Sequence, residues 1–86
     1  MAKYKIHIKP SAVKELERVP YKKDRQKIVN RIQALANNPR PVGSKKLAGQ
    51  ERYRLRQGWY RVIYAIDDLE ITIYVIKIGH RKDVYQ

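Results

Sequence analysis

The sequence predicts an α+β domain of order βααβββ, in which two N-terminal helices pack on one face of an antiparallel sheet and leave an open basic face. Three observations predict this class. Apolar residues alternate near the N-terminus and again over residues 51–78, they recur at helical spacing in between, and Pro or Gly separates the segments. The 86 residues suit one small core, so we expect a single domain over residues 1–86.

The first two elements are a strand and a short helix. Apolar and charged or polar residues alternate over residues 4–8, which predicts a strand with one apolar face. Pro10-Ser11 then interrupts the pattern. Ser11 is expected to be the N-cap of a helix that runs to about residue 19 and buries Val13 and Leu16.

A second, longer helix follows. Pro20 is expected at its first position, because its fixed φ suits the first turn. Asn37-Asn38-Pro39 ends the helix near residue 36, since proline cannot continue it. Its apolar face consists of Ile28, Ile32, Leu35 and Ala36.

The C-terminal half predicts a three-stranded meander. Residues 40–50 form a basic loop, and strands are expected at about 51–57, 59–66 and 70–78. The helices have nothing else to bury against, so they must cover one face of the sheet. The other face is then open to a partner.

The charge of the chain points to a polyanionic partner. Twenty Lys and Arg against eight Asp and Glu give a net charge of +12. That excess destabilises a compact chain by self-repulsion, so nucleic acid is the favoured partner, with a membrane surface or an acidic protein as alternatives. The absence of cysteine excludes disulfides and thiolate metal sites. The alternating N-terminal segment has no continuous apolar stretch, so no secretory signal and a cytoplasmic location are expected.

The hairpin YRLRQGWYRVIYAI places arginines together. A two-residue loop at Gln57-Gly58 would set Arg54 opposite Arg61 and Arg56 opposite Trp59, all on the open face, whereas a bulged turn would shift the pairing by one residue. A merely solvated face would favour mixed charges, because like charges directly opposite each other destabilise a sheet. Guanidinium groups suit forked contacts with phosphate, so the hairpin predicts an anion site.

The C-terminal segment GHRKDVYQ adds two candidates. His80 is the side chain expected to titrate near neutral pH beside the arginines, and Tyr85 has a ring for stacking and a hydroxyl. The alternative is an ordinary surface histidine and a tail residue. His7 is given no role. Asp67, Asp68 and Glu70 are expected to form a polar turn rather than a metal site, and no cofactor or metal is expected.

The segments KLAGQERYRLRQGWYRVIYAIDD and VIKIGHRKDVY resemble RelE-type toxins of the RelE/ParE superfamily, the toxin half of type II toxin–antitoxin pairs. The resemblance covers nearly the whole chain and implies the RelE-like microbial ribonuclease fold. It further implies an endoribonuclease that cuts mRNA in the ribosomal A site. The site residues that it implies are Arg54, Arg56, Arg61, Arg81 and Tyr85.

The chemistry of metal-independent RNA cleavage assigns roles to these residues. Attack of a 2′-OH on the adjacent phosphorus requires a base, stabilisation of the phosphorane and an acid. The arginines suit the second task, and His80 and Tyr85 are the candidates for proton transfer. Arginine stands at positions 54 and 56, where some family members have lysine. Arginine does not give up its proton, so the identity of the general base stays open. Further residues expected to bind RNA are Lys45, Lys46, Arg52, Trp59 and Lys82.

The expected partners are a RelB-like antitoxin, the ribosome with its mRNA, and operator DNA contacted through the antitoxin complex, with no membrane. Two alternatives remain. A ParE-like toxin would inhibit DNA gyrase, although the clustered arginines and terminal tyrosine argue against that branch. A non-catalytic basic module would need more exposed aromatic residues on the sheet than Trp59.

Overall fold

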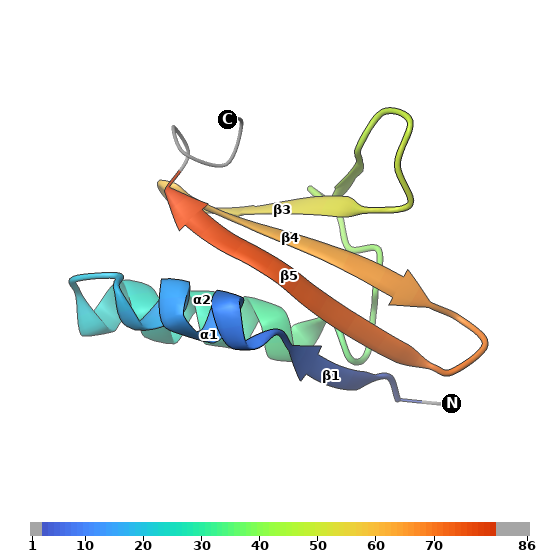
Figure 1. The fold of residues 1–86 in the computed structure, drawn as a ribbon, viewed down its shortest axis with the longest axis horizontal. Coiled ribbons are helices and arrows are strands. Elements are labelled where there is room, and N and C mark those ends of the chain that lie inside the picture. The colour runs from blue at the N-terminus through green and yellow to red at the C-terminus, as the bar shows by residue number, and fades with distance from the viewer. Residues whose placement is uncertain (1–2, 81–86) are drawn as a thin grey trace.

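A computed structural model describes residues 3–80 of the chain. The elements are β1 (Lys5–Ile8), α1 (Pro10–Glu17), α2 (Lys22–Ala34), β2 (Lys45–Lys46), β3 (Tyr53–Gln57), β4 (Tyr60–Asp67) and β5 (Thr72–His80). The predicted α+β class and βααβββ order are confirmed, and β2 is a short addition within the predicted loop. Both helices lie on one side of the sheet in Figure 1, and within residues 3–80 no helix or strand covers the other side.

The sheet has the strand order β1-β5-β4-β3-β2. The strands from β2 to β5 pair antiparallel, whereas β1 pairs parallel with β5. The sheet is therefore mixed, and the expected antiparallel arrangement holds for the meander but not for β1. Side chains alternate with the same period in both kinds of strand pair, so the pattern of β1 alone does not reveal its direction.

Helix α1 begins two residues earlier than predicted. Pro10 is its first residue and Lys9 takes the N-cap position without a side-chain hydrogen bond, so the prediction of Ser11 as N-cap is wrong. The fixed φ of proline suits the first turn of a helix. An N–H at that position has no acceptor within the helix, so proline loses no hydrogen bond there. The prediction for Val13 is also wrong, because it is 39% exposed while Ala12 is fully buried. Leu16 packs against the core as predicted.

Helix α2 begins after Tyr21 at the N-cap position, so Pro20 precedes the helix instead of opening it. The guanidinium of Arg25 donates a hydrogen bond to the carbonyl of Val19 at 2.5 Å and ties the interhelical turn. Within residues 3–80, no helix is long and apolar enough to cross a membrane. The predicted apolar face is confirmed, because each of its members is at most 4% exposed: Ile28, Ile32, Leu35 and Ala36.

The core lies between these helices and the near face of the sheet. Tyr64 is fully buried there, and its hydroxyl donates to the carbonyl of Pro39 at 2.8 Å; burial raises the pKa of this hydroxyl. Glu15 of α1 accepts a hydrogen bond from the backbone N–H of Ile78 at 3.2 Å. This contact satisfies an N–H of β5 beyond the end of β1, where an unpaired sheet edge would otherwise be exposed.

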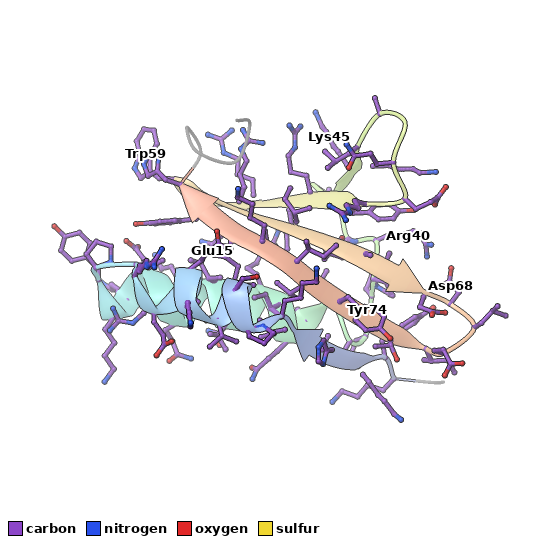
Figure 2. The ribbon with its side chains drawn as sticks, viewed as in Figure 1. Glu15, Arg40, Lys45, Trp59, Asp68 and Tyr74 are labelled. Carbon is purple, nitrogen blue, oxygen red and sulfur yellow. The ribbon has the colours of Figure 1, made fainter. Side chains whose placement is uncertain are left out.

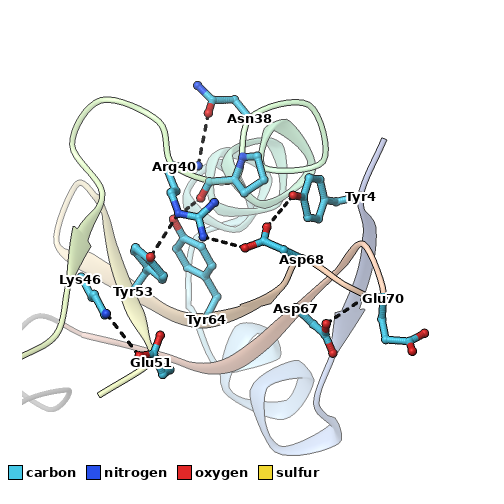
Figure 3. Close-up of polar contacts among 11 residues, drawn as sticks. Tyr4, Asn38, Arg40, Lys46, Glu51, Tyr53, Tyr64, Asp67, Asp68 and Glu70 are labelled. Atoms are coloured by element: carbon cyan, nitrogen blue, oxygen red, sulfur yellow. Dashed lines mark hydrogen bonds and ion pairs between the residues drawn. The ribbon is translucent and has the colours of Figure 1, made fainter. Parts of the chain in front are cut away.

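A polar cluster joins the loop after α2 to the sheet (Figure 3). Arg40 forms an ion pair with Asp68 at 3.1 Å, and its Nε donates to the hydroxyl of Tyr53 at 3.2 Å. The hydroxyl of Tyr4 donates to the other carboxylate oxygen of Asp68 at 2.7 Å. The cluster thus links the residue before β1, strand β3, the loop and the β4–β5 turn. These bonds are consistent with the prediction that Asp68 belongs to a polar turn.

We expect Asp68→Asn to lower the melting temperature at pH 7, and the difference from the wild type to vanish in acid. The hydrogen bond from Tyr4 and the Arg40 guanidinium lower the pKa of Asp68 below its ordinary 3.8. A lowered folded-state pKa stabilises the protein above the unfolded pKa, and this contribution is lost as pH falls through the folded pKa. The measurement is thermal unfolding between pH 7 and pH 3, with the exposed Glu70→Gln as control. A difference that stays constant down to pH 3 would contradict the assignment.

Candidate functional site on the open sheet face

The β3–β4 hairpin differs from the predicted register. Arg56 lies opposite Arg61, and Arg54 lies opposite Ile63, so the predicted pairs Arg54–Arg61 and Arg56–Trp59 are wrong. The two turn residues are Gly58-Trp59, and Gly58 has a φ of +60°. A glycine with positive φ at the first central position is typical of a type II′ turn, which accounts for a loop one residue later than predicted.

The three hairpin arginines nevertheless share the open face, as predicted. Because the register differs by two positions, every side chain keeps its face. Tyr53 and Leu55 lie opposite Tyr64 and Val62 on the helix side. The other face then carries Arg54, Arg56 and Arg61.

These arginines lie at different depths. Arg56 is exposed and Arg54 is partly buried, whereas Arg61 is only 7% exposed. Arg56 and Arg61 are direct cross-strand neighbours, an arrangement of like charges that destabilises a sheet without an anion between them. A face of mixed solvated charges would not be expected to set two arginines directly opposite each other.

Two lysines extend this cationic face. Strand β2 sets Lys45 opposite Arg54. On the other side of the hairpin, Lys77 lies opposite Ile63 and next to the position of Arg61. Lys45 was predicted to bind RNA, but Lys77 was missed by the sequence analysis. Together the face consists of Lys45, Arg54, Arg56, Arg61 and Lys77, which we call the cationic face.

A β-bulge explains why Lys77 was missed. Ile63 pairs with Lys77 but Tyr64 pairs with Val75, so Ile76 is an extra residue in β5. Strict alternation from Val75 would direct Lys77 toward the helices. The extra residue reverses the alternation, so that Ile78 enters the core and Lys77 joins the open face.

Other predicted RNA-binding residues are dispersed. Lys46 lies opposite Tyr53, on the helix side of the sheet, and forms an ion pair with Glu51 at 3.3 Å. Arg52 is exposed just before β3. Trp59 is 66% exposed in the hairpin turn. Figure 2 shows Lys45 and Trp59 toward opposite ends of β3, both away from the helices. Their roles in RNA binding stay predictions.

His80 is separated from the cationic face by the sheet register. It lies opposite Tyr60, whose side is the helix side, and the two rings meet edge to face at 5.8 Å. Its ring also stacks with that of Trp59 at 6.4 Å. Within residues 3–80, His80 therefore lies with the aromatic residues at the strand ends, on the other side of the sheet from the hairpin arginines. Its role in proton transfer stays a prediction. Arg81, Lys82 and Tyr85 lie outside the described residues.

The electrostatics of the open face are polarised along β4. Within residues 3–80, the acid that shares this face on β4 is Asp67, at the far end of the strand from Arg61. Its carboxylate accepts the N–H of Glu70 at 2.9 Å and is part of the turn, as predicted. The hairpin end of the face is therefore its positive end. Guanidinium groups are suited to forked contacts with phosphate, and arginine keeps its proton in proteins.

Sequence comparison places the chain in a family. A profile described as "ParE toxin of type II toxin-antitoxin system, parDE" matches residues 6–85. The chain belongs to the RelE/ParE superfamily of type II toxins. Toxin RelE of Mycobacterium tuberculosis H37Rv is 32% identical over 84 residues, covering 96% of this chain and 87% of that protein. Toxin RelG of the same strain is 36% identical over 55 residues, so the match spans 61% of RelG and 60% of this chain.

The folds agree as well. The structure described as an archaeal RelE–RelB complex from Pyrococcus horikoshii OT3 matches this RelE-type toxin with a TM-score of 0.83 at 29% identity. The match covers 94% of this chain and 98% of that chain. The predicted RelE-like fold is therefore confirmed.

Proposed function

We propose that this RelE-type toxin is a ribosome-dependent endoribonuclease that cleaves mRNA in the A site and so inhibits translation. The observation that supports this most strongly is the cationic face, where Arg54, Arg56 and Arg61 lie together on the side of the sheet that no helix or strand of residues 3–80 covers. Its relation to a toxin named RelE supports the same assignment.

The cationic face suits the charge that develops during RNA cleavage. The 2′-OH attacks the neighbouring phosphorus, the bond to the 5′-oxygen breaks, and the products are a 2′,3′-cyclic phosphate and a 5′-OH. The phosphorane that forms between these states carries more negative charge than the ground-state phosphate. Preorganised guanidinium groups, of which Arg61 is already largely shielded from water, stabilise that charge most in the transition state.

Proton transfer is the part of the reaction that these arginines do not perform. Arg54, Arg56 and Arg61 stay protonated, so they serve neither as base nor as acid. His80 and Tyr85 remain the proposed proton carriers. A toxin with strong phosphate binding and weak acid–base groups benefits from a substrate held in reactive geometry, which is what the ribosome supplies in this proposal.

We further propose that a RelB-like antitoxin is the partner that restrains the toxin. The archaeal relative was solved in a complex with RelB. A net charge of +12 attracts an antitoxin segment with acidic residues, and such a segment would neutralise the cationic face. Operator DNA is proposed to be contacted through the antitoxin in the same complex.

Inhibition of DNA gyrase is the second candidate, because the matching family profile carries the ParE description. A gyrase inhibitor acts by binding and needs no catalytic site. It gives no account of three arginines gathered against their mutual repulsion on the open face. We therefore place it second.

The two candidates are separated by parallel assays on the purified toxin. In a reconstituted translation system we expect mRNA cut at the A-site codon, with 2′,3′-cyclic phosphate and 5′-OH ends. In a supercoiling assay we expect gyrase to be unaffected. Intact mRNA together with blocked supercoiling would overturn the nuclease proposal. Cut mRNA with a 3′-OH and a 5′-phosphate would exclude attack by the 2′-OH.

A further inference from the structure

An aromatic pair lies on the open face outside the cationic face. Tyr74 of β5 and His7 of β1 are direct neighbours in the parallel strand pair, and their rings meet edge to face at 5.6 Å and 65°. Tyr74 is 37% exposed and His7 is exposed. Figure 2 shows Tyr74 on β5, well away from Trp59 at the hairpin end. An edge contact with His7 orients the tyrosine ring without covering its face.

This aromatic pair is continuous with the cationic face. Tyr74 lies opposite Ala65, which is on the same side of β4 as Arg61. The two positions on β4 are four residues apart, a distance of about 13 Å along the strand. Ala65 contributes a single methyl group beside the ring. Ile63, which is 7% exposed, lies between Arg61 and Ala65 on this face, so the path from the arginines to Tyr74 crosses an apolar part of the sheet.

The surrounding charges limit where RNA would run. Lys5 shares the face and lies opposite Thr72, next to the aromatic pair. Asp67 lies opposite Thr72 from the other strand and adds a negative charge beyond Tyr74. Lys5 and Asp67 thus flank Thr72 with opposite charges, so the excess positive charge lies on the side of Tyr74 toward the cationic face. A phosphate backbone held by the arginines would reach the aromatic pair before it reaches Asp67.

We propose that Tyr74, oriented by His7, stacks on a base of the single-stranded RNA whose phosphate is held by the arginines. Aromatic side chains on an open sheet are a common way to bind single-stranded RNA, because every base presents a face for stacking. The proposal rests on the proposed ribonuclease function and adds a positioning residue to it. Tyr74 would fix which nucleotide reaches Arg61, since base and phosphate contacts are a set distance apart.

The test is equilibrium binding of a labelled single-stranded RNA that is 2′-O-methylated throughout, so that it cannot be cut. Low salt is used because phosphate contacts weaken as salt rises. We expect Tyr74→Ala to weaken binding about 5- to 150-fold and Tyr74→Phe to stay within about twofold of the wild type. Tyr21→Ala is the matched control, because Tyr21 is 69% exposed at the start of α2.

A single abasic position scanned along the RNA identifies the stacked base. At one position its loss should weaken wild-type binding as much as Tyr74→Ala does, and should leave the Tyr74→Ala protein unaffected. Thermal unfolding confirms that each variant is folded.

The outcomes separate the two proposals. If Arg56→Ala weakens binding and Tyr74→Ala does not, the stacking role is wrong while the phosphate site stands, and the aromatic pair would instead suit a protein partner. If neither variant changes binding, or the wild type does not bind, the stacking role and the phosphate contacts of the cationic face both fail, whereas cleavage on the ribosome tests the ribonuclease function separately. Equal losses for Tyr74→Ala and Tyr21→Ala would also overturn the stacking role.

Discussion

Replacing Arg54 and Arg56 together by alanine is expected to slow A-site mRNA cleavage by at least about 100-fold, while the protein stays folded. Both side chains project from β3 onto the open face, and neither belongs to the buried core. Removing one preorganised donor from a transition-state oxyanion site typically slows a reaction by about 10²–10³-fold. Stability should not fall much, because the repulsion between Arg56 and Arg61 is relieved.

A charge-matched control separates the site from the overall charge. Lys22→Ala with Lys27→Ala removes two positive charges from exposed positions on α2, on the opposite side of the sheet. This double variant should cleave within a few-fold of the wild type in single-turnover reactions on programmed ribosomes. Equal losses in the two double variants would mean that net charge, and not the cationic face, carries the activity.

Lysine substitutions test the geometry of the same site. Arg54→Lys with Arg56→Lys keeps the charge but loses the planar fork that contacts two phosphate oxygens at once. We expect an activity between that of the alanine variant and that of the wild type. Full activity would show that charge alone suffices at these positions.

The largest effect on stability is expected for Ile32→Ala. Ile32 is 1% exposed on α2 and is part of the cluster that packs against the sheet. Deleting its outer carbons removes buried apolar surface and leaves a cavity, which costs about 2–5 kcal/mol. Since small domains are stable by only about 5–15 kcal/mol, this change removes a large share of the total.

Urea unfolding measures this effect against a surface control. Val42 is 98% exposed, so Val42→Ala should change the free energy of unfolding by less than about 0.5 kcal/mol. The midpoint for Ile32→Ala should fall while the slope of the transition stays the same. Similar midpoints for the two variants would contradict the placement of Ile32 in the core.

Much of the fold and part of the site follow from local patterns. The helical spacing of Ile28 and Ile32 predicted the buried face of α2 correctly, because a 3.6-residue period leaves one stripe for the core. Alternation in the hairpin predicted which side carries Arg54, Arg56 and Arg61, even though the predicted pairs were wrong. A two-residue shift in register keeps every side chain on its face, so the prediction survived the error.

The helix starts show where local signals compete. Ser11 is a favoured N-cap residue, yet Pro10 begins the helix because its restricted φ already fits the first turn. The helix start also differs in which residue it buries: Ala12 is buried, whereas Val13 had been predicted to be. Both residues are apolar and adjacent, so packing against the sheet decided between them.

The sequence by itself determined the family, the order of the elements and the face on which the hairpin arginines lie. These features depend on motifs and on periods within one segment. Only the tertiary structure decided the parallel pairing of β1, the placement of Lys45 and Lys77 on the cationic face, and the separation of His80 from it. Each depends on hydrogen bonds between distant segments. The bulge at Ile76 is the clearest case, since one extra residue reverses the faces of all that follow in β5.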